Sequence, residues 1–309
     1  MNITPGLRAA LLITLATLMW GGNAVAGKLA VGQISPLSVV FVRWVLVSGF
    51  MWLLYGRAVR AHWPKIRDQL PLLILTSVIG FTAFNTLMYY AAHSTTAVNI
   101  GILQGSMPIF VLAGARLFYG TRVTVAQSVG VMIALVGVIA VATRGDPASL
   151  LALGLNPGDG LMLIACLSYA MYTLALKRRP PMDGAAFFTL LSVIAMLTSI
   201  PLIVVDVAAG SFFWPTQTGW MVVAFVAIFP SMLSQLFFLR GVDLVGPGRA
   251  GTYVNLVPIW ASILGVLILG ERFALYHGIG LALVMIGIAL TQREARAVSA
   301  MAVPEAAKR

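Results

Sequence analysis

The sequence predicts an all-α membrane protein in which ten transmembrane helices form two inverted five-helix repeats. The first observation is composition: 60% of the 309 residues are hydrophobic and 9% are charged, whereas soluble domains carry about 25% charged residues. The second is that apolar runs long enough to cross a bilayer as helices recur along the chain. The third is an internal duplication within this apolar sequence. The alternating pattern of a membrane β-barrel is absent, which favours helical spans.

The predicted spans follow from the apolar runs and the polar breaks between them. In chain order they cover residues 9–28, 36–55, 70–91, 97–119, 124–143, 159–177, 184–206, 218–239, 249–270 and 274–292. The connecting loops are short, so we expect no soluble domain. The tail at residues 294–309 is charged and rich in alanine, and we expect it to be a disordered cytoplasmic segment.

Basic residues predict the orientation. With the N-terminus in the cytoplasm, most of the 20 Lys and Arg residues fall on the cytoplasmic side, in the loops after the even-numbered spans and in the tails. Only Lys28, Arg43, Arg144 and Arg272 fall on the outer side. The positive-inside rule therefore predicts that both termini are cytoplasmic in a multi-pass inner-membrane protein. It also explains the net charge of +11 without a nucleic-acid partner.

The duplication relates residues 97–143 to residues 247–293, about 150 positions later. Matching pairs include Gly101 and Gly251, Pro108 and Pro258, Gly120 and Gly270, Arg122 and Arg272, and Gly137 and Gly287. The earlier spans match in the same way, which predicts repeats at residues 8–143 and 157–293. Each repeat holds five spans, an odd number, so the second must cross the membrane upside down relative to the first.

Several short motifs carry a family resemblance. They are Trp20-Gly21-Gly22-Asn23 with Lys28 on the first span, Pro36 and Arg43 on the second, Pro108 on the fourth and Gly270-Glu271-Arg272 after the ninth. Over residues 8–292 the chain resembles the EamA-like family of the drug/metabolite transporter superfamily. The resemblance implies a central cavity shared by both halves and export of small metabolites or amino acids. One position departs from the family pattern, because Thr121 stands where the first repeat should match Glu271.

Corresponding glycine and proline breaks predict where a solute would bind. Gly101, Gly105 and Pro108 share one helical face, and Gly251, Asn255 and Pro258 do the same in the second repeat. Such breaks free backbone polar groups toward a cavity. With the polar and aromatic faces of neighbouring spans, the candidate cavity residues are Trp20, Asn23, Thr82, Asn85, Tyr89, Gln104, Pro108, Tyr169, Tyr172, Gln235, Asn255 and Pro258. The alternative is that these groups pack or hydrogen-bond between helices.

Charged residues offer fewer candidates. Lys28 and Arg43 could receive a carboxylate or phosphate of the solute, or could extend from the span ends to the membrane surface. All nine acidic residues lie in loops, tails or span ends, and Glu271 is the one acid that we expect to be worth testing as a charge partner. Without an acid deep in a span, we expect facilitated transport or exchange. The three histidines lack ligand spacing, so no metal site is expected.

These features together predict a secondary transporter rather than an enzyme. Its partners would be a small-molecule substrate and the lipid bilayer, with no cofactor, because no nucleotide-binding loop is present in the sequence. We expect efflux of amino acids or related amphipathic compounds across the inner membrane by alternating access. The alternative is a carrier of anionic solutes such as sugar phosphates or nucleotide sugars, and the non-transport alternative is a membrane-embedded enzyme. The sequence does not specify the oligomeric state.

Overall fold

The computed structural model describes residues 4–146 and 156–306. Ten helical segments in this part are long and apolar enough to cross a membrane, which confirms the predicted number. Six spans are formed by a single long helix: α1 (Pro5–Ala30), α2 (Pro36–Ala61), α8 (Val125–Ala142), α10 (Pro157–Ala175, extended by the short helix η3, Leu176–Arg178), α11 (Gly184–Ala208) and α16 (Leu275–Ala306). The short helices α3 (Trp63–Ile66) and η1 (Arg67–Gln69) lie between the second and third spans.

Spans three and eight each contain a π-helical turn. Span three runs through α4 (Leu70–Ser77), η2 (Val78–Ala83) and α5 (Phe84–Ala91). Span eight runs through α12 (Gln217–Val226), η4 (Ala227–Leu233) and α13 (Ser234–Val245). The two π-helical turns begin at matching positions of the repeats. Such turns leave backbone carbonyls free to bond with side chains, and they occur often at functional sites.

Spans four and nine are broken where the sequence predicts it. Span four consists of α6 (Ala97–Gln104) and α7 (Met107–Tyr119), and span nine consists of α14 (Pro247–Tyr253) and α15 (Leu256–Leu269). The first break falls at Gly105 and Ser106, just before Pro108, and the second at Val254 and Asn255, just before Pro258. Proline lacks the amide hydrogen that would continue the preceding helix.

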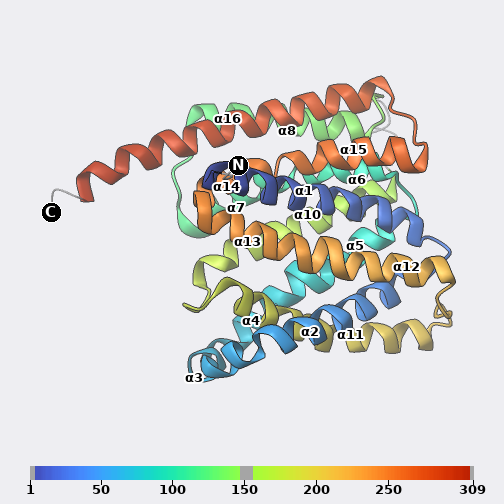
Figure 1. The fold of residues 1–309 in the computed structure, drawn as a ribbon. Coiled ribbons are helices and arrows are strands. Elements are labelled where there is room, and N and C mark those ends of the chain that lie inside the picture. Colours follow the sequence, from blue (N-terminus) through green and yellow to red (C-terminus); the bar gives the residue numbers. More distant parts are fainter. Residues whose placement is uncertain (1–3, 147–155, 307–309) are drawn as a thin grey trace.

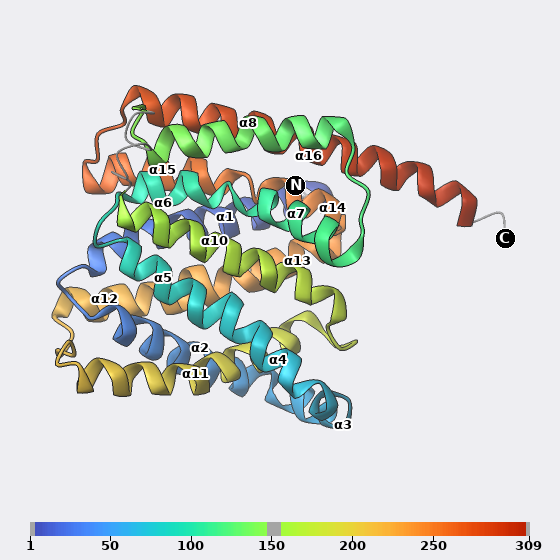
Figure 2. The same ribbon diagram turned by 180° about the vertical axis from the view of Figure 1, so that it is seen from behind.

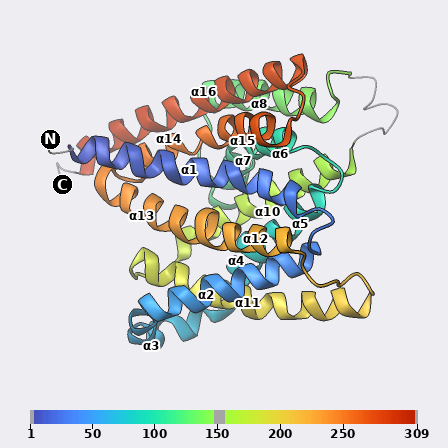
Figure 3. The same cartoon turned by 45° about the vertical axis from the view of Figure 1, so that its right-hand side comes forward.

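The bundle is built from pairs that join one span of each repeat. At one edge α8 packs along α16, and at the opposite edge α2 packs along α11. Between these edges α1 packs on α13 and α15, and Figure 2 shows α10 beside α5 and α6 on the reverse face. Figure 3 shows both chain termini on the same side as α3. We name that side the terminal end and the other side the far end.

Side-chain caps define where most of these helices begin. Thr4, Ser35, Thr96, Thr124, Asn156, Asp183 and Thr216 each accept a backbone N–H bond at the first turn of the helix that follows. Small polar residues are preferred there because their oxygens satisfy amides that have no partner inside the helix. Gly120 and Gly270 end α7 and α15 in the left-handed conformation, with φ of 63° and 64°. These paired glycines are the helix ends of the duplicated motif.

The last helix extends beyond the predicted tenth span. Helix α16 continues through Ala306, so the backbone of residues 294–306 is helical, while residues 307–309 of the expected tail lie outside the described residues. The physical reason is local composition. The tail is rich in alanine, with arginine, methionine and glutamate, and these residues have high intrinsic helix propensity.

Glycines allow the edge pair α8 and α16 to approach closely. A Cβ atom on Gly130 would lie 2.7 Å from the carbonyl oxygen of Gly287, and one on Gly137 would lie 2.7 Å from that of Gly280. These distances are shorter than van der Waals contact, so only glycine fits at either position. In a bilayer such close packing replaces the hydrophobic effect as the force that joins helices.

We therefore expect Gly137→Leu to lower the stability of the folded protein by about 1–3 kcal/mol or more, because the added side chain must push α8 away from the α16 backbone. Gly49→Leu is the matched control, since Gly49 is an exposed helical glycine on α2 with no atom within 4 Å of an added Cβ. Thermal unfolding of the detergent-purified protein measures both. Equal melting temperatures for the two variants would contradict the packing described for α8 and α16.

Candidate functional site

A buried arginine lies where four spans meet. Arg43 on α2 is 5% exposed. With a rise of about 1.5 Å per residue, its Cα lies about 10 Å along the helix from the far end. Its Nε donates to Ser231 Oγ of η4 at 2.7 Å, and its Nη1 donates to Asn85 Oδ1 at 2.6 Å and to Tyr89 Oη at 3.0 Å, both on span three. A longer bond of 3.5 Å reaches Asn23 Oδ1 on α1.

The π-helical turns create two of these partners. Pro230 has no amide hydrogen to bond the carbonyl of Val226, and the hydroxyl of Ser231 donates to that carbonyl instead. The Ser231 oxygen is thereby positioned to accept from Arg43. In η2, the carbonyl of Phe81 accepts from Asn85 Nδ2 at 2.6 Å, which turns the Asn85 oxygen toward Arg43. Each side chain therefore bonds a carbonyl of its own span and the guanidinium.

The guanidinium is charged and has only neutral protein partners. Arginine stays protonated in proteins, and a buried ion normally lies beside an opposite charge. Among the described residues no carboxylate forms an ion pair with Arg43, and its Nη2 has no hydrogen-bond partner. The uncompensated charge is costly within a membrane span and is typical of a functional residue. The alternative that Arg43 extends to the membrane surface does not fit its burial.

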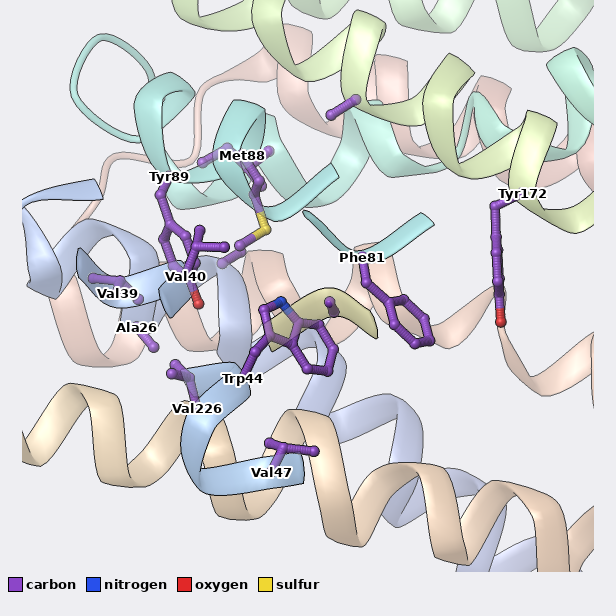
Figure 4. Packing of buried hydrophobic residues seen from close by; sticks show 14 of the residues in the cluster. Ala26, Val39, Val40, Trp44, Val47, Phe81, Met88, Tyr89, Tyr172 and Val226 are labelled. Carbon is purple, nitrogen blue, oxygen red and sulfur yellow. The ribbon is translucent and has the colours of Figure 1, made fainter. Parts of the chain in front are cut away.

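A chain of aromatic side chains begins beside the charge. The Arg43 guanidinium carbon lies 5.3 Å from the centroid of the Trp44 ring, which stacks on Phe81. Ring contacts continue from Phe81 to Tyr172 and from Tyr172 to Tyr169. Figure 4 shows Trp44 beside Phe81, and the Tyr89 hydroxyl pointing from α5 toward α2. The site therefore combines one positive charge with an extended aromatic wall.

Lys28 has a different role from Arg43. Its Nζ donates to the carbonyl oxygens of Ala92 and Thr95, both at 2.9 Å, just after the last residue of α5. A lysine at this place satisfies carbonyls that have no partner inside the helix and complements the negative end of the helix dipole. Lys28 thus holds the far end of α1 against that of span three, and its ammonium group is already engaged by the backbone.

Glu271 caps a helix of the other repeat. Its two carboxylate oxygens accept from the amides of Ala97 and Val98 at 2.8 Å and 2.9 Å, at the first turn of α6. The position that matches Ala97 in the second repeat is Pro247, the first residue of α14, which has no amide hydrogen to donate. The second repeat therefore has no first amide for a carboxylate of the first repeat to cap. Thr121, at the position that matches Glu271, is exposed.

Some of the remaining candidate residues from the sequence belong to the Arg43 cluster, and the others make packing or hydrogen-bond contacts between helices. Asn23 and Tyr89 bond one another at 3.3 Å and belong to the Arg43 cluster. Thr82 bonds Thr198 of α11 at 2.9 Å, and Asn255 bonds Gln292 of α16. The Trp20 ring packs at a tilt against Phe238 and the Tyr169 ring against Phe84, and Tyr172 is 8% exposed. Gln104, Gln235 and Pro108 are half-buried, while Pro258 is buried in α15.

A second polar cluster at the far end joins both repeats. Asp159, in the first turn of α10, accepts from Thr95 Oγ1 at 2.5 Å and from Asn99 Nδ2 at 3.2 Å. Asn99 Oδ1 bonds His277 Nε2 of α16 at 3.0 Å, and His277 Nδ1 accepts from the amide of Ala274. Two of the acids expected at span ends, Asp159 and Asp206, are buried, each 1% exposed. Their hydrogen-bond partners come from other spans, which no local pattern in the sequence relates to them.

Known transporters resemble this chain in sequence and in fold. Residues 7–143 and 156–293 each match the EamA-like transporter family. The transporter YyaM of Bacillus subtilis is 25% identical over 88% of this chain and 89% of its own length. The inner membrane transporter YedA of Escherichia coli K12 is 25% identical over 88% of this chain and 87% of its own length. A solved crystal structure at 17% identity has a TM-score of 0.62 and covers 94% of this chain and 98% of that one, which is a likeness in fold.

We expect Glu271→Ala to reduce the stability of the protein by about 1–3 kcal/mol, because the variant leaves two buried amides of α6 without a charged acceptor. Thr121→Ala is the matched control from the first repeat, where an exposed side chain occupies the corresponding position. Thermal unfolding in detergent compares the two variants. A melting temperature for Glu271→Ala equal to that of Thr121→Ala would show that the cap contributes nothing.

Proposed function

The chain belongs to the EamA-like transporter family, and on that premise we propose that it is a secondary transporter that exports small amphipathic metabolites such as amino acids. Transport itself follows from the family, and both curated relatives named above are transporters. The class of solute, the direction of transport and the orientation of the termini are our proposal. A membrane-embedded enzyme is excluded as the alternative by the family match.

The Arg43 cluster is the observation that carries the proposed solute class. A buried guanidinium without a carboxylate partner needs a negative group from outside the protein, and the rings from Trp44 to Tyr169 offer apolar contact beside it. An amphipathic molecule with a carboxylate and an apolar body satisfies both requirements. Amino acids with large side chains have this composition.

The broken and paired spans support alternating access. The far halves of spans four and nine pack so tightly that a Cβ on Gly101 would lie 2.3 Å from Ala261 Cβ. Their terminal-end halves pack on different neighbours, α7 on α10 and α14 on α13. Inverted repeats allow this asymmetry to be exchanged between the two ends. With the termini in the cytoplasm, as the basic residues favour, this conformation is closed toward the outside.

The anionic alternative, a sugar phosphate or nucleotide sugar, draws less support. That hypothesis relied on Lys28 and Arg43 acting together on a group with more than one negative charge. The Lys28 ammonium is engaged by two backbone carbonyls, so Arg43 alone is available to the solute. A single guanidinium matches a singly charged carboxylate better than a phosphate dianion.

The direct test of this function is a growth screen. A strain that overexpresses the protein is challenged with toxic amino acids and their analogues, beside the same strain carrying the Arg43→Gln variant. We expect resistance to a subset of the compounds, and lower intracellular accumulation of the same compounds. Sensitivity unchanged from the empty-vector strain across amino acids and other amphipathic metabolites would contradict the proposed solute class.

We expect Arg43→Gln to reduce transport at least about tenfold, since truncating a hydrogen-bonded buried charge that meets an opposite charge costs about 2–5 kcal/mol of binding. Arg43→Lys should recover only part of the loss, because lysine keeps the charge without the planar fork. The matched control is Arg57→Gln, which removes an exposed arginine from the same helix. Initial efflux rates from preloaded cells, normalised to membrane expression, decide the matter. Equal rates for the Arg43 and Arg57 variants would contradict a central role for Arg43.

A further inference from the structure

The groups around Arg43 contain more donors than acceptors. Arg43 Nη2 has no partner among the described residues, and the indole Nε1 of Trp44 is a buried donor without one. Trp44 is 2% exposed, and Figure 4 shows its nitrogen on the side of the ring turned away from Phe81. The neighbouring oxygens of Asn85, Tyr89 and Ser231 already accept from the guanidinium. A ligand for these donors must therefore bring acceptors, and an ionised carboxylate is a group that carries acceptors only.

The bonds already present restrict how a carboxylate can bind. A guanidinium receives a carboxylate through two parallel N–H groups, either at Nη1 and Nη2 or at Nε and Nη2. Nη1 is held by two strong partners, Asn85 and Tyr89, whereas Nε is held by Ser231 alone. Ser231 has the Val226 carbonyl as a second partner and keeps it when Arg43 is withdrawn. The Nε and Nη2 edge is thus the one that a carboxylate takes at least cost.

We propose, resting on the transport function above, that the solute binds through a single carboxylate that displaces Ser231 from the Nε of Arg43. This displacement also breaks the bond that ties span two of the first repeat to span eight of the second. Binding of the solute then also frees span two of the first repeat from span eight of the second. The solute replaces the hydrogen bond that these spans lose when they move apart. The empty carrier keeps the Arg43–Ser231 bond and changes conformation more slowly than the loaded one.

The mode of transport follows from this arrangement. A carrier that reorients faster when loaded exchanges solute across the membrane faster than it releases solute in one direction. Removing the Ser231 hydroxyl frees the empty carrier from the Arg43–Ser231 bond. It also removes the group that competes with the solute for the Nε of Arg43. Hydrogen bonds to a charged group are strong enough that one of them changes a rate or an affinity about tenfold or more.

The experiment uses the purified full-length protein in liposomes loaded with labelled L-phenylalanine. Net efflux into buffer and exchange against external L-phenylalanine are measured for the wild type, Ser231→Ala and Ser234→Ala. Ser234 is the matched control, a fully buried serine on the same span whose hydroxyl bonds only the Pro230 carbonyl. We expect wild-type exchange to exceed net efflux, and Ser231→Ala to raise net efflux about tenfold toward the exchange rate. Ser234→Ala should keep the wild-type ratio, and a Ser231→Ala ratio equal to it would overturn the proposed restraint.

Two inhibitors of the exchange test the carboxylate itself. 3-Phenylpropanoate carries the carboxylate without an ammonium group, and L-phenylalaninamide carries the ammonium without a carboxylate. We expect inhibition by the first and none by the second. Equal inhibition by the amide would overturn the carboxylate proposal.

A second variant that keeps the shape of the site tests the proposal even if Ser231→Ala fails to fold. Asn85→Asp places a carboxylate 2.6 Å from Nη1 with no change in size, and gives Arg43 a permanent counter-ion. We expect the folded variant, identified by an unchanged or higher melting temperature, to lose inhibition by 3-phenylpropanoate. Inhibition at the wild-type concentration would contradict the role of the uncompensated charge.

The proposed function and this inference fail in different ways. If the growth screen finds exported solutes that all lack a carboxylate, the chain is an exporter and the carboxylate proposal is wrong. If no solute is carried in cells or in liposomes, both proposals fail. Export of carboxylate-bearing solutes with inhibition by 3-phenylpropanoate supports both.

Discussion

A buried positive charge without a protein counter-ion is the constraint on which the rest of this structure depends. The guanidinium of Arg43 remains ionised, and its four neutral partners come from spans one, three and eight. Neutral oxygens reduce the cost of burying the charge without cancelling it. The turn that contains Pro230 places the Ser231 oxygen at this charge, and the Asn85 side chain places its amide oxygen there. The bundle therefore holds a positive charge without a counter-ion where its two repeats meet, and an anion bound there would stabilise it.

The two repeats are equivalent in plan and differ in detail. Both carry a π-helical turn in the third span and a proline-linked break in the fourth. Of the two broken spans, only span four has a carboxylate at its first turn, because Glu271 accepts from the amides of α6 whereas Pro247 gives α14 no first amide hydrogen. The buried Asp159 cluster reinforces this turn at the far end. These contacts favour the conformation in which the far end is closed, so the duplicated scaffold does not have two equal states.

Local patterns were enough to predict the spans and their breaks, since apolar runs, glycine and proline act within a few residues. They could not separate Lys28 from Arg43, which look alike as basic residues near the same membrane face. The difference arises from packing: Lys28 lies beside the end of α5, whereas Arg43 extends from span two to partners on spans three and eight. The π-helical turns were missed because one extra residue barely alters the period of an apolar helix. Trp44 was not singled out in the apolar sequence, although its ring centroid lies 5.3 Å from the guanidinium carbon of Arg43 and its buried nitrogen has no hydrogen-bond partner.

The most direct test of this account is a structure of the protein bound to L-phenylalanine, determined by electron microscopy in a lipid nanodisc. The account predicts the solute carboxylate on Nε and Nη2 of Arg43, with the Ser231 hydroxyl bonded to the Val226 carbonyl alone. The rings of Trp44 and Phe81 should lie against the apolar body of the solute. A bound solute whose carboxylate lies away from Arg43, with the Arg43–Ser231 bond intact, would contradict the central claim.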